Sequence, residues 1–168
     1  GHHMPFLAKM FPNIIFHLYD PNDFEVKETE QIHIYKQFFL DDDAGQWANS
    51  DGHTLFISDI RTEPATEENV QQNMDLQESW RKIMNPDLTM FKFRLPWNKS
   101  TTQYPAGDIY IQAFVGPTST ETRLIVEKDA PIIEYSNQKY EEQMFYHNSI
   151  ARGQYYDIGL GELDIARD

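Results

Sequence analysis

Two apolar strand segments, separated by a helix-length segment, constrain the fold of this chain more than any other feature. Residues 53–61 and 88–97 each run from apolar side chains into charged ones, and residues 67–84 between them have the length of a helix. Strand, helix and strand at this spacing predict a right-handed crossover between two parallel strands. Because parallel strands present their carboxyl ends at one edge of a sheet, Asp59 and Lys92 are predicted to lie side by side there.

The remaining segments predict a mixed sheet with flanking helices. A continuous apolar run or an alternating pattern, as in a strand, is found in four further segments: residues 13–19, 32–39, 108–115 and 121–126. The short link between the last two predicts an antiparallel hairpin. Helical spacing is found in residues 5–11 and 136–151, with Gly153 as the expected end of the second helix.

Loops are predicted where acidic, glycine, proline or hydroxyl residues gather, in residues 41–52 and 96–107. The acidic run at 41–43 is interpreted as a solvated loop face. Residues 155–168 have no predicted element. The whole pattern predicts a single domain over residues 1–168, of the α/β class, with a mixed, mostly parallel sheet that ends in an antiparallel hairpin.

Composition limits the class of protein. The 168 residues are 40% hydrophobic and 14% aromatic, enough for a sizeable core. There is no cysteine, which removes disulfides and thiolate metal sites. No apolar run is long enough to span a membrane. The opening Gly-His-His-Met is interpreted either as a purification remnant or as native sequence.

The chain is strongly acidic, with 27 acidic against 14 basic residues and a formal charge of −13. Nucleic-acid binders usually carry a basic patch, so this balance argues against broad, non-specific RNA affinity. A local cationic groove remains possible near the predicted rim of the sheet, formed by Arg61, Lys92, Arg94, Lys99 and Arg123.

Lys92 is the most unusual residue of the predicted strands, because its neighbours Phe91 and Phe93 are apolar. It is either a surface lysine whose amine reaches water or a functional amine, since burial favours the neutral form that a general base needs. Asp59 is either a helix or turn cap or the partner of Lys92. Glu121, beside a short turn, is either a hairpin-end charge or a residue that orients Lys92.

Four further positions have more than one interpretation. Asp20 before Pro21 suits a turn, and also the strand-end acid that binds ribose hydroxyls in nucleotide folds. Trp97 either packs on the core or stacks on a nucleobase. His17 and His33 are interpreted as strand residues rather than metal ligands, so no metal site is expected.

Four motifs, in this order and spacing, together resemble a known viral family. They are Ile-Ser-Asp-Ile-Arg at 57–61, Lys-Phe-Arg-Leu-Pro-Trp at 92–97, Glu-Thr-Arg-Leu at 121–124 and Glu-Glu-Gln-Met-Phe-Tyr-His-Asn at 141–148. The chain resembles the poxvirus cap-specific mRNA 2′-O-methyltransferase, which is also the regulatory subunit of poly(A) polymerase. The resemblance runs from Gly1 to about Arg152.

The resemblance implies a Rossmann-like fold that binds S-adenosyl-L-methionine, and a Lys-Asp-Lys-Glu tetrad for transfer to a ribose 2′-hydroxyl. Asp59, Lys92 and Glu121 match its last three members. The first lysine precedes the family's glycine-rich loop, and residues 1–7 resemble the end of that loop. We therefore expect a chain without its amino-terminal part, which transfers methyl groups poorly or not at all.

The resemblance also implies ligand contacts. For the cofactor, these are Gly1 at the loop, Asp20 at the ribose, Phe39, Leu40 and Ile60 at the adenine, and Asp59. For the cap and RNA, they are Trp97 as one stacking ring, Glu141 as a guanine-reading acid, and Arg94. Two positions depart from the family. Thr118 replaces the second ring, for which Tyr104 is a possible substitute, and Asn98-Lys99 replaces an acid.

The predicted function is that of an mRNA cap ribose methyltransferase of a large DNA virus. The expected cofactor is S-adenosyl-L-methionine, and the expected substrate is capped mRNA. One alternative is a poly(A) polymerase regulatory subunit that binds RNA and a polymerase catalytic subunit. The other is a catalytically degenerate Rossmann domain. The expected location is the host cytoplasm or the virion, with no membrane partner.

Overall fold

The computed structural model describes residues 2–48, 50–64, 66–112, 115–116 and 118–156. The chain forms two compact units, Gly1–Ala44 and Gly45–Asp168, each with its own secondary structure. That residues 1–168 make a single domain stays a prediction. No helix among the described residues combines the length and the apolar character needed to cross a bilayer.

The first unit contains helix α1 (Met4–Met10) and two parallel strands, β1 (Phe16–Tyr19) and β2 (Ile32–Tyr35). All three were predicted, although β1 and β2 are shorter than expected. Ala8 of α1 packs with Val26 and Ile32 in a small core. The Gln31 side-chain amide donates hydrogen bonds to three carbonyl oxygens, those of Ala8, Phe11 and Ile14, and so ties the end of α1 to the start of β1.

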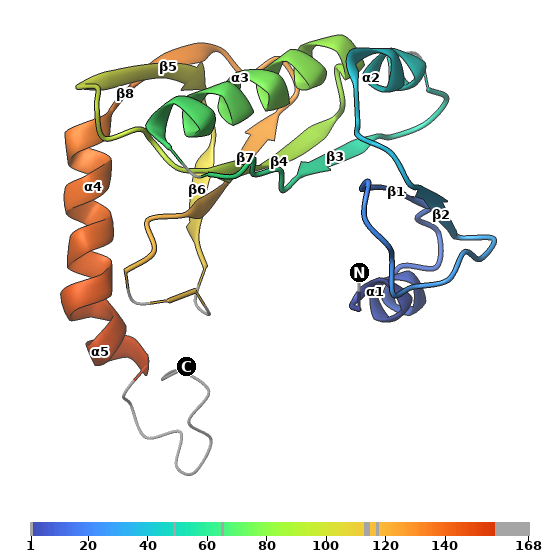
Figure 1. Ribbon diagram of the computed structural model, residues 1–168, viewed down its shortest axis with the longest axis horizontal. Helices are drawn as coiled ribbons and strands as arrows, with labels where there is room; N and C mark the ends of the chain where they lie inside the picture. The colour runs from blue at the N-terminus through green and yellow to red at the C-terminus, as the bar shows by residue number, and fades with distance from the viewer. Residues whose placement is uncertain (1, 49, 65, 113–114, 117, 157–168) are drawn as a thin grey trace. The chain divides into compact units, whose positions relative to one another are not determined.

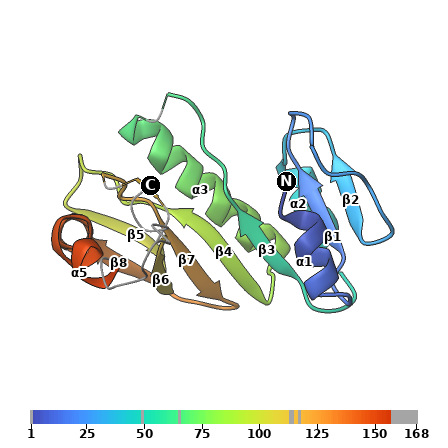
Figure 2. The same ribbon diagram turned by 90° about the horizontal axis from the view of Figure 1, so that it is seen from below.

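The second unit is built on the predicted strand–helix–strand segment, β3 (Leu55–Ser58), α3 (Glu67–Met84) and β4 (Leu88–Phe93). The two strands are parallel neighbours, as predicted, and α3 packs against β4 (Figures 1 and 2). Thr66 caps the helix, because its side chain accepts a hydrogen bond from the Asn69 amide. Asn85 ends it in the left-handed conformation, with φ of 48°.

Two antiparallel strands complete a four-stranded sheet in the order β3-β4-β7-β6. They are β6 (Asp108–Ile111) and β7 (Thr122–Glu127), and their pairing confirms the predicted hairpin. Burial alternates along the central strands. Phe91 and Phe93 of β4 and Leu124 of β7 are fully buried, whereas Lys92 lies on the opposite face of the sheet.

Two segments predicted as loops contain regular structure, so these predictions were wrong. Helix α2 (Asp41–Trp47) occupies the acidic run, and β5 (Thr101–Pro105) lies in residues 96–107. Asp43 is not a solvated acid, because it is buried and accepts hydrogen bonds from the Leu40 amide and the Gln37 side chain, both at 2.9 Å. These bonds satisfy donors at the start of the helix.

Strand β8 (Ile132–Ser136) was not predicted either, and it pairs with β5 in an antiparallel ribbon. The parallel pairs are β1–β2 and β3–β4, and the antiparallel pairs are β4–β7, β6–β7 and β5–β8. The mixed α/β class is therefore confirmed. The antiparallel share is larger than predicted, because β5 and β8 come from segments with no assigned strand.

The predicted carboxyl-terminal helix is present but is not uniform. It consists of α4 (Asn137–Tyr146), a π-helical turn over His147–Ala151, and α5 (Arg152–Tyr156). Gly153 lies inside α5 and does not end the helix, contrary to the prediction. Ser136 caps α4 by accepting a hydrogen bond from the Lys139 amide.

Two glycine-to-alanine substitutions should change stability in opposite directions. A Cβ at Gly107 would overlap the Ile125 carbonyl oxygen and lie 3.1 Å from Leu124 Cδ1, so Gly107→Ala should lower the free energy of unfolding by about 2 kcal/mol. Gly45 lies in α2 with open space around it. Gly45→Ala should therefore raise the free energy of unfolding by about 1 kcal/mol, because alanine has a higher helix propensity than glycine. Urea unfolding measures the stability of both variants. Stability changes of the same sign in the two variants would contradict the close packing at Gly107 and the open space at Gly45.

Candidate active site

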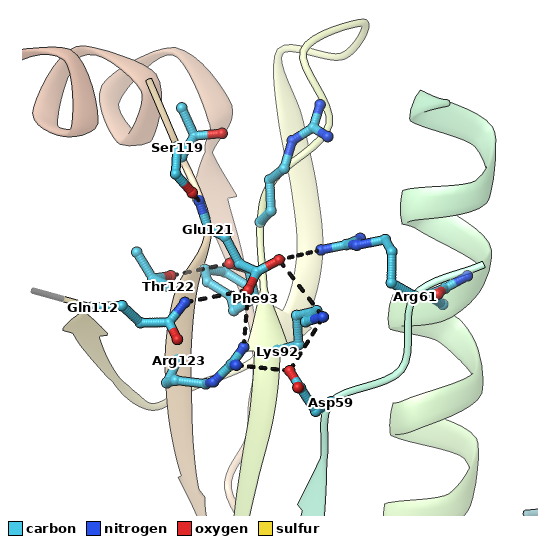
Figure 3. A network of polar contacts seen from close by, with 12 residues as sticks. Asp59, Arg61, Lys92, Phe93, Gln112, Ser119, Glu121, Thr122 and Arg123 are labelled. Carbon is cyan, nitrogen blue, oxygen red and sulfur yellow. Dashed lines mark hydrogen bonds and ion pairs between the residues drawn. The ribbon is translucent and has the colours of Figure 1, made fainter. Parts of the chain in front are cut away.

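Lys92 lies at the centre of a cluster of charged side chains at one rim of the four-stranded sheet (Figure 3). Its Nζ is 3.2 Å from Asp59 Oδ1 and 3.8 Å from Glu121 Oε2. Asp59 directly follows β3, and Glu121 directly precedes β7. Because β3 runs parallel to β4 and β7 runs antiparallel to it, the end of β3 and the start of β7 both lie beside the end of β4. The structure thus brings together three side chains that are far apart in sequence.

Three more side chains complete the network around the two carboxylates. Arg61 Nη2 lies 3.1 Å from Glu121 Oε2, and the Gln112 side-chain amide donates to Glu121 Oε1 at 3.2 Å. Arg123 contacts both carboxylates, with Nη2 2.7 Å from Asp59 Oδ1 and Nη1 3.3 Å from Glu121 Oε1. Arg123 is directly opposite Lys92 in the β4–β7 register, which explains why both reach the same pair of acids.

The cluster is partly shielded from water. The side chain of Lys92 is 14% exposed and that of Glu121 24%, whereas that of Asp59 is 63% exposed. Arg61 and Arg123 are similarly enclosed. The cationic groove expected from the sequence is therefore a network in which Arg61, Lys92 and Arg123 each face a carboxylate. Charge pairs at this depth are stronger than pairs in open solvent.

The environment of Glu121 shifts its pKa. Burial acts to raise the pKa, but the hydrogen bond from Arg61, the charge of Lys92, the Gln112 amide and the charge of Arg123 together outweigh it. The net effect is a pKa below the ordinary value of 4.5. Glu121 is thus held as a carboxylate beside Lys92.

A buried tyrosine contacts the residues on both sides of this carboxylate. The Tyr140 hydroxyl of α4 donates to the Thr120 carbonyl oxygen, and its oxygen lies 3.1 Å from the Thr122 hydroxyl. Burial raises the pKa of Tyr140 far above its ordinary value, so the phenol stays neutral. Arg123 was expected near this rim as part of a cationic groove, whereas the contacts of Gln112 and Tyr140 were not predicted. The alternation of β7 was the one available signal, because it places Arg123 on the face of Lys92.

Trp97 lies on the segment that follows β4 and is 57% exposed, so it does not pack into the core. The Arg94 guanidinium carbon lies 4.7 Å from the centre of the Trp97 ring. Glu67, at the start of α3, accepts a hydrogen bond from the Trp97 amide at 2.7 Å and forms an ion pair with Arg94. Arg94 and Trp97, both expected at the cap, are therefore joined by a residue that sequence analysis did not select.

Tyr104 is not available as a second stacking ring, so this suggestion from the sequence was wrong. The residue is 2% exposed, and its hydroxyl donates to the Met74 carbonyl oxygen at 3.0 Å inside the core. Burial raises the pKa of Tyr104 well above its usual range. Thr118 is exposed, and Glu141 lies on the exposed side of α4.

The expected cofactor residues fall in both units. In the first unit, Asp20 follows β1 and its Oδ1 accepts hydrogen bonds from the Asn22 backbone amide and side chain, at 2.8 and 2.9 Å. This is the turn that Asp20-Pro21 predicts. Phe39 packs edge-on against Tyr19, with ring centres 4.9 Å apart, and Leu40 is 60% exposed.

An exposed carboxylate and exposed apolar surface at the ends of two parallel strands suit the hydroxyls and the base of a nucleoside. In the second unit, Ile60 follows Asp59 and is half-buried. The expected contact at Gly1 lies outside the described residues.

His17 and His33 are strand residues, as predicted. They are directly opposite each other in β1 and β2, with ring centres 4.9 Å apart. Within the described ranges, no group of three or more histidine, aspartate and glutamate side chains is arranged to bind a metal ion.

The lowered pKa of Glu121 predicts a pH-dependent contribution to stability. A carboxylate whose pKa is lower in the folded than in the unfolded chain stabilises the fold when the pH is above the unfolded pKa, here 4.5. This stabilisation is lost as the pH falls through the folded pKa. Glu121→Gln should therefore lower the free energy of unfolding by about 2 kcal/mol near neutral pH, and the difference from wild type should shrink as the pH falls below 4.5.

Urea unfolding at several pH values measures this effect. Glu127→Gln is the matched control, because Glu127 is exposed at the other end of β7 and should change stability little. A Glu121→Gln deficit that is constant across this pH range would contradict the assigned ion pairs.

Comparison with known proteins places these features in a family. A family model described as poly A polymerase regulatory subunit matches residues 1–158. The cap-specific mRNA (nucleoside-2′-O-)-methyltransferase of fowlpox virus (strain NVSL) is 31% identical over 117 residues, which are 58% of this chain and 36% of that protein. The match thus spans about a third of the relative's length.

A solved structure shares the fold. The chain is similar to bluetongue virus VP4, whose structure reveals a multifunctional RNA-capping production line, with a TM-score of 0.70 and 14% identity over 84% of this chain and 26% of that one. This likeness confirms the predicted Rossmann-like α/β fold. Because the family model matches more than nine-tenths of the sequence, this protein belongs to the poly A polymerase regulatory subunit family.

Proposed function

We propose that this protein is an S-adenosyl-L-methionine-dependent methyltransferase that acts on the ribose 2′-hydroxyl of capped mRNA. The observation that carries the proposal is the amine of Lys92, placed between Asp59 and Glu121 at 3.2 and 3.8 Å. The name of the fowlpox virus relative supports the same chemistry. We assign Asp59, Lys92 and Glu121 as catalytic residues.

The proposed reaction needs a hydroxyl oxygen in line with a methyl group. A ribose hydroxyl is a weak nucleophile, so a neighbouring amine can act in two ways. A neutral Lys92 accepts the hydroxyl proton as a general base. A charged Lys92 donates a hydrogen bond to the hydroxyl oxygen that directs a lone pair toward the methyl group, and the hydroxyl proton then passes to water. Both roles require the amine at a fixed position, because positioning of the reacting groups contributes a large part of the rate enhancement.

The surrounding side chains fix that position. Glu121 is held by Arg61, Gln112 and Arg123, so its carboxylate is a firm partner for Lys92. Asp59 is held by Arg123 on one side and remains the most exposed member of the cluster. Because the Asp59 side chain is 63% exposed, we propose that the substrate hydroxyl approaches the amine from the side of Asp59.

The proposed cofactor is S-adenosyl-L-methionine, which supplies a methyl group on a sulfonium and therefore a neutral leaving group. In the first unit, the Asp20 carboxylate would bind ribose hydroxyls, and Phe39 and Leu40 would contact the adenine. That Asp59 and Ile60 of the second unit contact the cofactor stays a prediction from the family resemblance. These roles rest on the family resemblance and on the exposure of Asp20 and Leu40.

The proposed RNA contacts are Trp97 and Arg94 after β4 and Glu141 on α4. Exposed Trp97 offers a flat apolar surface to a base, and Glu141 offers a carboxylate to a guanine edge. A virally encoded protein with this substrate would act in the host cytoplasm or the virion, which we propose as its location.

A second candidate function is favoured by the matching family model, which describes a regulatory subunit of poly A polymerase. In that role the chain would bind a polymerase catalytic subunit and RNA, and its methyl-transfer site would matter less. The two functions are compatible if they use different surfaces.

Substitution of Lys92 separates the two functions. Lys92→Ala should lower methyl transfer to capped RNA at least about 100-fold, because no other lysine among the described residues lies between the two carboxylates. Stimulation of a poly(A) polymerase catalytic subunit should stay unchanged. The assay follows labelled methyl groups from S-adenosyl-L-methionine into capped RNA, with the protein as its gene encodes it.

Lys128→Ala is the matched control, since Lys128 is an exposed lysine just after β7 and should keep full activity. Methyl transfer by Lys92→Ala at the wild-type rate would refute the assignment. Absence of methyl transfer and of S-adenosylhomocysteine binding in the wild type would instead favour a degenerate domain.

A further inference from the structure

Two buried amide side chains of α3 form hydrogen bonds with the segments that carry the charged cluster. The Gln77 side-chain amide donates to the Lys92 carbonyl oxygen at 3.1 Å. The Asn73 side chain accepts a hydrogen bond from the Thr62 backbone amide at 2.9 Å and donates one to the Thr62 hydroxyl at 2.8 Å. The helix thus contacts both the end of β4 and the segment that follows β3.

The backbone pairing of β3 with β4 ends just before these two segments. The last residues paired between the two parallel strands are Ser58 and Phe91. Lys92 is the next residue of β4, and residues 59–62 follow β3 without an assigned strand. The carboxylate and the guanidinium that residues 59–62 contribute to the charged cluster therefore lie beyond the paired part of β3. The bonds to α3 give this segment and Lys92 a common support.

The burial of Asn73 and Gln77 is unusual for amides, since their residues are only 2% and 1% exposed. Burial of an amide costs free energy unless the group is hydrogen-bonded, and an apolar side chain of the same shape can stabilise a core equally well. The other buried polar residues of α3, Glu78 and Arg81, form an ion pair with each other at 2.7 Å. The bonds of Asn73 and Gln77 therefore specify where the bonded segments lie more than they add to net stability.

Helix geometry relates the two amides to each other. Asn73 and Gln77 are separated by about one helical turn, so they lie on the same side of α3 and about 6 Å apart along its axis. The helix has 18 residues and is capped at both ends, by Thr66 and by Asn85. A single regular helix thus sets the spacing between the two segments that it supports.

We propose that Asn73 and Gln77 are positioning residues of the methyl-transfer site, which set the spacing between Lys92 and the segment that carries Asp59. Gln77 acts through the backbone of Lys92, and Asn73 acts through Thr62. Because both amides are almost fully buried, neither contacts substrate or cofactor. This inference rests on the proposed function and adds two residues of α3 to the site.

Steady-state methyl transfer to capped RNA, with the protein as its gene encodes it, tests the proposal. Gln77→Met keeps an unbranched side chain of similar length and removes the donor, and Asn73→Leu likewise replaces the amide by apolar groups. Each substitution should lower kcat about tenfold or more, because small displacements of reacting groups are costly. The KM values for S-adenosyl-L-methionine and capped RNA should change less than about twofold. Gln72→Met is the matched control, because Gln72 is exposed on the same helix and should keep the wild-type kcat.

A double substitution separates positioning from a general structural defect. If Gln77 acts through Lys92, its loss has little further effect once the Lys92 amine is absent. Gln77→Met should therefore lower the residual rate of Lys92→Ala by less than about twofold. A structural defect independent of Lys92 would lower that residual rate by the same factor as it lowers the wild-type rate, and this result would overturn the role of Gln77.

Calorimetric binding of S-adenosylhomocysteine shows whether each variant is folded. Asn73→Leu and Gln77→Met act on different segments, so one folded variant is enough for the test. Wild-type kcat in a folded variant, or a loss confined to KM, would overturn the role of the substituted residue. Loss of binding in both variants would overturn the proposal, because the amides would then be needed for the fold itself.

The proposed function is judged separately with Lys92→Ala. Loss of methyl transfer in Lys92→Ala, combined with wild-type kcat in Gln77→Met and Asn73→Leu, would refute this inference and leave the proposed function in place. Absence of methyl transfer by the wild type would refute the proposed function, and this inference with it.

Discussion

The ion pairs of Lys92 with Asp59 and Glu121 are the interaction on which the candidate site depends. Two carboxylates are shared among Lys92, Arg61 and Arg123, so each charge has an opposite charge within 4 Å. Removal of one member of such a partly buried set leaves another charge uncompensated, which costs more than the loss of an exposed pair. The cluster therefore stabilises the rim of the sheet and also fixes the position of the Lys92 amine.

The sheet topology makes this cluster possible. The parallel pair β3–β4 places Asp59 beside the end of β4, and the antiparallel pair β4–β7 places Arg123 directly opposite Lys92. The alternate residues Phe91 and Phe93 fill the core, so their burial fixes which face Lys92 occupies. A shift of one residue in either register would move Lys92 to the core side and separate it from both acids. The alternation of side chains along β4 thus determines both the packing of the core and the position of Lys92.

Much of this arrangement could be predicted from the sequence, because the apolar periodicity of the strands and the lengths of their connections indicate it. The crossover over residues 53–97 and the hairpin of β6 and β7 follow from apolar periodicity and short connections, and the convergence of Asp59 with Lys92 follows from the parallel crossover. The β5–β8 ribbon could not be predicted, since both strands are short, β5 is largely polar and ends in proline, and the two segments lie far apart along the chain. Helix α2 was missed because its acidic first turn resembles a solvated loop, although Asp43 supplies hydrogen bonds at the helix start. Glu67 was missed because its partners, Arg94 and Trp97, lie far from it along the chain.

The name of the fowlpox virus relative and the geometry around Lys92 both support the proposed methyl transfer. The measurement that tests this account most directly is the position of the methyl group on capped RNA after incubation with S-adenosyl-L-methionine and the protein as its gene encodes it. Nuclease digestion and mass spectrometry should locate the label on the ribose 2′-oxygen of the nucleotide next to the cap. A label on a base, or no transfer by a preparation that binds S-adenosylhomocysteine and capped RNA, would contradict the role assigned to Lys92 and its two carboxylates.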